Sequence, residues 1–158
     1  MLEKTVNFAN LLLAALVVGT MFGIWLGFNP TDLSAGTYVE MQQLAIRSLN
    51  VTMPVLGGFT ALLTLASAFF SRRTRPRMFM LLAAFVCLVI AGLVTRFLNQ
   101  PINAVVITWT ASSPPSNWIE IRDEWWKWHV ARTAIGVVGL CLLIAANMVR
   151  NGNEKAGS

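Results

Sequence analysis

The stretch from Trp118 to Arg132 carries the side chains of this sequence that are best suited to chemistry. It contains the single histidine, His129, and four of the six tryptophans. In a helix, five of its side chains recur at spacings of four, three, four and three residues and share one face: Trp118, Arg122, Trp125, His129 and Arg132. This face runs into a segment that can cross a membrane, where polar side chains are costly. We therefore predict a functional role for this face, above all for His129 and Arg132.

Two other segments place polar side chains at the same level of the expected helices. The first carries Glu40, Gln43, Arg47 and Asn50, again at spacings of three and four. The second carries Arg96, Asn99 and Asn103. If the three faces converge, they line a polar pocket within a helix bundle, a common place for ligand sites.

The elements that must position these faces are membrane helices. Only 12% of the residues are charged, against about 25% in ordinary soluble domains. Four apolar segments, 8–28, 53–70, 78–97 and 134–149, approach the ~20 residues that a spanning helix needs. The sequence predicts an all-α, antiparallel four-helix integral membrane bundle that forms a single domain over residues 1–158. Its second helix should run from about 36 to 70, with Pro54 kinking it or loosening it locally. The second and fourth helices should extend beyond the bilayer on the non-cytoplasmic side.

The basic residues predict the orientation of this bundle. Arg72, Arg73, Arg75 and Arg77 crowd one short loop, and such loops face the cytoplasm. Both termini should then be cytoplasmic as well, and the chain should be a multi-pass protein of the plasma membrane. The formal net charge of +5 fits contact with anionic lipid better than contact with nucleic acid.

Structural explanations exist for several of these residues. The tryptophans can form an interfacial belt, and Glu40 and Arg47 can form an ion-pair network that only fixes packing. Asn99 and Asn103 can bond backbone groups that Pro101 leaves free. No HxxH, HxxxH or ExxH spacing occurs, so we predict no metal site, although haem with His129 as its single axial ligand stays open.

Three groups of residues resemble a known family of small four-helix membrane proteins, the anthrone-oxygenase-like family. They are Tyr38-Val-x-x-Met-Gln42 with Arg47 and Met53-Pro54; Asn99-x-Pro101-Ile-Asn103; and Trp118-x-x-x-Arg122-x-x-Trp125-x-x-x-His129-x-x-Arg132-Thr133. The resemblance implies oxygen-dependent conversion of a hydrophobic, anthrone-like aromatic substrate that enters from the bilayer.

The residue roles follow from that resemblance. His129 would be the base, with Arg122, Arg132 and Arg47 stabilising the oxyanion. Asn99, Asn103 and Trp125 would position the substrate, and the remaining polar side chains of the three faces, Glu40, Gln43, Asn50, Arg96 and Trp118, would also bind it. The chemistry requires no cofactor.

Two other functions fit the same sequence. The protein can be a non-catalytic or accessory protein that holds a lipid, quinone or haem, or a structural bundle that pairs with another membrane protein. The expected partners are a hydrophobic small molecule and the lipid bilayer, and the pattern is compatible with a homo-oligomer.

Overall fold

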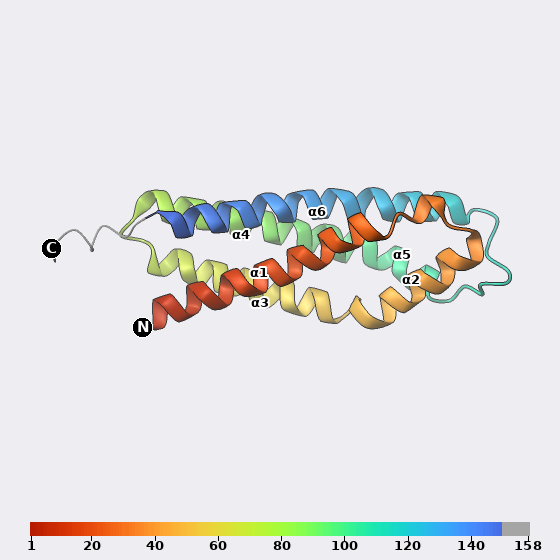
Figure 1. Ribbon diagram of the computed structural model, residues 1–158, viewed down its shortest axis with the longest axis horizontal. Coiled ribbons are helices and arrows are strands. Elements are labelled where there is room, and N and C mark those ends of the chain that lie inside the picture. The colour runs from red at the N-terminus through yellow and green to blue at the C-terminus, as the bar shows by residue number, and fades with distance from the viewer. Residues whose placement is uncertain (150–158) are drawn as a thin grey trace.

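The computed structural model of the protein describes residues 1–149, and it is helical almost throughout (Figure 1). The elements in chain order are α1 (Leu2–Gly27), η1 (Pro30–Asp32), α2 (Ala35–Leu49), α3 (Thr52–Phe70), α4 (Arg75–Val94), η2 (Thr95–Asn99), α5 (Gln100–Val106) and α6 (Trp118–Met148). Four helical stretches are long and apolar enough to cross a membrane: Leu2–Asp32, Thr52–Phe70, Arg75–Val106 and Trp118–Met148. The predictions of an all-α chain and of four potential spans are confirmed. The C-terminal residues that we expected on the cytoplasmic side lie outside the described part.

All the helices run along one long axis (Figure 1). The first residues of α1, the α3–α4 turn and the last residues of α6 lie at one end of this axis. The opposite end holds α2, α5 and the loop that leads into α6. We call the half with the α3–α4 turn the closed half, and the half with α2 and α5 the open half.

The closed half has a core of small and branched apolar side chains. Its buried members come from α1, α3, α4 and α6: Ala14, Ala68, Leu81, Ala84, Leu88, Leu143 and Ala146. Small residues let membrane helices approach closely. A methyl group built on Gly139 of α6 would lie 3.1 Å from the Cβ of Cys87 on α4, so these two helices already touch there.

The expected continuous helix over 36–70 is interrupted in its middle. α2 ends at Leu49, and α3 begins at Thr52. Pro54 occupies the first turn of α3, where a residue without a backbone N–H costs nothing. We expected Pro54 to kink one helix, but instead it begins a second one, so α2 and α3 are separate elements.

A wide turn also interrupts the helix that follows. Residues Thr95–Asn99 form η2, a π-helical turn, and Pro101 lies in the first turn of α5 just after it. π-turns shift the faces of a helix relative to one another. Here the turn leaves Arg96 exposed while Asn99 is fully buried.

Candidate active site

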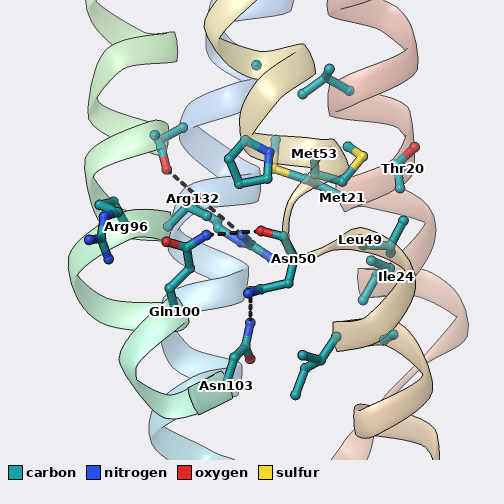
Figure 2. A pocket seen from close by; sticks show the side chains of 18 of the residues that line it. Thr20, Met21, Ile24, Leu49, Asn50, Met53, Arg96, Gln100, Asn103 and Arg132 are labelled. Atoms are coloured by element: carbon teal, nitrogen blue, oxygen red, sulfur yellow. Dashed lines mark hydrogen bonds between the residues drawn. The ribbon is translucent and has the colours of Figure 1, made fainter. Parts of the chain in front are cut away.

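A cavity of about 640 Å³ lies next to the junction of α2 and α3 (Figure 2). α1, α2, α3, α4, η2, α5 and α6 all contribute to its wall. Most of the wall is apolar, with Met21, Met53 and Leu88 among its residues, and a few polar side chains enter it. This volume lies in the range of small-molecule pockets, and the mixture of side chains is typical of them.

The half-buried cation of this cavity is Arg132 of α6. Its Nη1 donates a hydrogen bond to Thr95 Oγ1 at 3.0 Å. Its Nη2 and Nε lie 2.9 and 3.4 Å from Nδ1 of His129. Within residues 1–149, no carboxylate forms an ion pair with Arg132. An arginine without a counter-ion beside an apolar cavity is suited to bind an anionic group.

His129 supports Arg132 from behind and is itself fully buried. A guanidinium can only donate, so Nδ1 of His129 must be the acceptor. Nε2 therefore carries the ring proton, and this N–H donates a hydrogen bond to the carbonyl oxygen of Met21, 3.1 Å away. Both ring nitrogens are thus engaged, and His129 is not part of the cavity wall. A role as axial haem ligand would require one nitrogen to leave its present partner.

Aromatic rings pack against this pair. The ring of Trp125 lies parallel to the His129 ring, with centroids 5.1 Å apart and an interplanar angle of 5°. Trp126 stacks on the same imidazole at 5.6 Å. Of these rings only Trp125 belongs to the cavity wall, and its buried indole N–H has no hydrogen-bond partner among residues 1–149. The stack fixes the plane of His129, and Trp125 offers an aromatic surface to a flat ligand.

Four carboxamides belong to the polar part of the cavity wall, those of Gln42, Asn50, Gln100 and Asn103, and Figure 2 shows the last three. Asn103 Nδ2 donates to Asn50 Oδ1 at 2.9 Å, and Gln42 Nε2 donates to Asn103 Oδ1 at 3.3 Å. Gln100 Nε2 donates to the backbone oxygen of Asn50 at 3.0 Å. These bonds join α2 to α5 beside the break between α2 and α3.

Five of the residues that we expected to bind or react with substrate belong to the cavity wall. They are Asn50, Arg96, Asn103, Trp125 and Arg132. Arg96 reaches the cavity from its rim, where its side chain is exposed. Asn99 instead turns toward α6, where its Nδ2 donates to the backbone oxygen of Trp125 at 3.1 Å.

The structure does not bring the other expected residues to the cavity. Arg122 pairs with Asp123 at 2.8 Å and lies over the ring of Trp118, 5.0 Å from its centroid. Glu40 and Arg47 are exposed. Gln43 donates to the backbone oxygens of Val106, the last residue of α5, and of Ile107 and Trp109 just after it.

Five polar residues of the cavity wall were not among the expected site residues, namely Thr20, Gln42, Ser48, Thr95 and Gln100. A sequence signal existed for Gln42, because Tyr38, Gln42, Ile46 and Asn50 recur every four residues. Tyr38 is fully buried beside Trp118, and burial raises the pKa of its hydroxyl above its usual value. It remains protonated at neutral pH and acts here as a packing residue.

The part of the chain that the structure describes has no group of three or more His, Cys, Asp or Glu side chains that could hold a metal ion. The cavity wall brings together two guanidiniums, those of Arg132 and of Arg96 at the rim, with an indole and several amides, and the imidazole of His129 lies against Arg132 outside the wall. This set can bind and stabilise an anion on a flat apolar molecule.

Comparison with known proteins agrees with these features. The family model described as anthrone oxygenase matches residues 41–142, a region that contains most of the cavity wall. The chain belongs to this family. No curated protein and no solved structure matches it.

Proposed function

We propose that this protein is a membrane-embedded oxygenase that converts a hydrophobic, anthrone-like substrate in the cavity beside Arg132. One observation carries the proposal: Arg132 has no carboxylate partner within residues 1–149 and adjoins a largely apolar cavity of about 640 Å³. Family membership supports the reaction type.

The reaction replaces the two hydrogens of the anthrone methylene by a carbonyl oxygen. Loss of a first proton gives a carbanion whose charge is delocalised onto the ring carbonyl oxygen. Dioxygen oxidises this anion and forms a hydroperoxide at the former methylene carbon. The hydroperoxide then loses water, so that one oxygen atom of O2 remains in the quinone and the other leaves as water.

Arg132 would stabilise the oxyanion, because preorganised cationic donors favour charge that develops in the reaction. A substrate oxygen that takes the Arg132 donors also removes them from His129 Nδ1. The freed lone pair of Nδ1 can then accept the substrate proton, while Nε2 keeps its bond to Met21. Substrate binding would thus expose the base, and Trp125 would stack on the rings.

The same proposal includes the orientation of the protein. We place it in the plasma membrane as an antiparallel four-helix bundle, with the α3–α4 turn in the cytoplasm. Arg72, Arg73 and Arg75 are exposed at this turn, which supports that orientation. The cavity would then lie toward the non-cytoplasmic side.

The test is oxygen uptake by the purified protein in liposomes that contain anthrone, with empty liposomes as the control for spontaneous oxidation. We expect one O2 consumed for each anthraquinone formed. Arg132→Met should lose this activity, and Arg47→Met should keep it because Arg47 is exposed away from the cavity. Uptake equal to that of empty liposomes would contradict the proposal.

A second candidate function is binding without reaction, of a lipid, quinone or haem. It is favoured by the engagement of both His129 nitrogens, which leaves no free base at rest. A protein that binds a hydroxyquinone at the cavity but consumes no oxygen with any phenolic substrate would establish it.

A further inference from the structure

The cavity reaches the surface of the bundle between α1 and α2. Leu44 and Ser48 of α2 are part of its wall, yet both are exposed, and 68% of Leu44 is accessible. On the other side of this gap, Thr20 and Ile24 of α1 also belong to the wall (Figure 2). A residue that is both exposed and part of the wall marks an opening of the cavity.

The edges of this opening are apolar. Met41 and Leu44 are exposed on α2, and Phe22, Trp25 and Leu26 are exposed on α1. Exposed apolar side chains on a membrane protein face lipid more favourably than water. A molecule that passes this gap therefore comes from the hydrocarbon phase.

The two helices that border the gap are held by different partners. Hydrogen bonds join α1 to α3, between Asn10 and Thr64, and α1 to α6, between the Met21 carbonyl and His129. Hydrogen bonds from Gln42 and Gln43 join α2 to α5 and to the turn after it. In the described chain, no hydrogen bond joins α1 to α2.

α2 also has a point about which it can move. Its helix ends at Leu49, and Val51, between the two helices, is at φ −104° and ψ −47°. Such helix ends absorb the backbone rotation in hinge motions. The carboxamide bonds that restrain α2 are between uncharged groups, and these are weaker than charge-assisted ones.

We propose that the cavity takes up its apolar ligand sideways from the bilayer, through the gap between α1 and α2, while α2 moves outward about Asn50 and Val51. This inference rests on the proposed function only in requiring an apolar aromatic ligand. It concerns the rate of entry, and the test below uses a ligand that cannot be oxidised at a methylene, so it can fail independently of the oxygenase activity.

The test measures association and dissociation of 1-hydroxyanthraquinone with the protein in lipid nanodiscs, by stopped-flow absorbance. Ser48→Phe adds a ring at the mouth, and Ser48→Ala is the matched control. For Ser48→Phe we expect both rate constants to fall together, by about tenfold, at the low end of the range for variants of one site, and Kd to change much less than either rate constant. Ligand binding with a Kd near that of Ser48→Ala also shows that the variant is folded. If Ser48→Phe binds at wild-type rates, or changes only one of the two rate constants and with it Kd, the inference is wrong.

Two further variants test a competing entry route and the outward movement of α2: Gly92→Leu tests the route, and Gln43→Met tests the movement. The cavity wall also includes exposed residues on the side of α3 and α4, namely Pro54, Gly58, Gly92 and Arg96, which mark a second candidate opening there. If Gly92→Leu slows both rates and Ser48→Phe does not, entry occurs there and the proposal is overturned. Gln43→Met removes the bonds from α2 to the end of α5, and we expect it to raise both rates. Slower or unchanged rates in Gln43→Met would show that α2 does not move during entry.

Discussion

Gly139 of the closed half differs from Gly57 and Gly92 of the cavity wall. In the closed half, a methyl group on Gly139 would lie 3.1 Å from Cys87 Cβ and 3.5 Å from the Ala84 oxygen. In the open half, a methyl group on Gly57 or Gly92 would have no neighbour within 4 Å. Both of these glycines are part of the cavity wall. The same residue type thus allows close helix packing in one half and leaves room for a ligand in the other.

Two arginines, Arg77 and Arg132, differ in the same way. In the closed half, Arg77 is buried and pairs with Glu3 at 3.3 Å. In the open half, Arg132 is half-buried, and within residues 1–149 its hydrogen-bond partners are the uncharged Thr95 and His129. Breaking an internal ion pair leaves an uncompensated charge, and Arg132 is already in that state. This contrast supports the proposal that a ligand supplies an anion to Arg132.

We expect the largest effect at His129, which has two proposed roles: it accepts a hydrogen bond from Arg132, and it acts as the base. His129→Asn keeps an oxygen near the position of Nδ1 that can accept from Arg132, but it cannot take a proton. We expect it to bind 1-hydroxyanthraquinone nearly as well as the wild type and to lose turnover by about 10²- to 10⁴-fold, the range for a general base. His129→Phe should lose both. Equal turnover in His129→Asn and the wild type would exclude the base role.

The next effect concerns the free cation of the open half. Arg132→Met keeps the length and the apolar contacts of the side chain but removes the charge. We expect kcat/KM to fall by about 10²- to 10³-fold, as for loss of one oxyanion donor. Arg132→Lys should recover part of the activity, because it restores the charge without the planar geometry. If a variant without any cation at position 132 is active, the contrast drawn between Arg132 and the paired Arg77 is wrong.

A matched pair of substitutions tests the two kinds of glycine directly. Gly139→Leu should lower the free energy of unfolding by about 1–3 kcal/mol or more, because the core has no room for it. Gly57→Leu should leave stability nearly unchanged and weaken ligand binding, because its side chain would enter the cavity. Thermal denaturation in detergent and binding of 1-hydroxyanthraquinone measure the two effects. Equal destabilisation by both variants would contradict the comparison.

The amide wall should show an intermediate effect. Asn103→Leu removes the partner of both Gln42 and Asn50, and a buried polar group left without a partner costs about 1–3 kcal/mol. We expect lower thermal stability together with weaker binding. Asn147→Leu is the control in the closed half, because within residues 1–149 the Asn147 side chain donates to a carbonyl of its own helix and to no other residue. A larger loss of stability in the control would argue against a structural role of the amide wall.

The smallest effect is expected at the exposed charges of α2. Glu40→Gln and Arg47→Gln should each change the free energy of unfolding by less than about 0.5 kcal/mol, as for most surface substitutions. Neither should alter kcat/KM, since neither residue touches the cavity. A clear loss of activity in either variant would mean that α2 turns this face inward at some stage of the reaction.

The sequence predicted one of the three polar faces better than the other two. α6 is a single regular helix, so Trp125, His129 and Arg132 lie on one side of it, as their spacing predicts. The face of α2 was misjudged, because an amphipathic helix with both Glu40–Arg47 and Tyr38–Ile46 at helical spacing offers two faces. Burial of Tyr38, Gln42 and Ile46 decides between them, and this depends on contacts with α5 and α6 that no local pattern reveals.

The prediction for the third face, that of Arg96, Asn99 and Asn103, does not hold because the backbone there is irregular. Arg96, Asn99 and Asn103 share a face only if the helix is regular, whereas η2 inserts a π-turn at Thr95–Asn99. The extra residue in this turn brings Thr95 to Arg132 and directs Asn99 to the Trp125 carbonyl. Pro101 signalled an interruption, but spacing alone could not tell whether the helix would kink or widen.

The central claim is that Arg132 makes the cavity an anion site for a flat apolar molecule. The most direct measurement is the visible absorbance spectrum of 1-hydroxyanthraquinone bound to the protein, at a pH where the free compound is a neutral phenol. We expect the spectrum of the phenolate with the wild type and that of the neutral phenol with Arg132→Met. A bound compound that remains neutral in the wild type, or an identical spectrum in both proteins, would contradict the account.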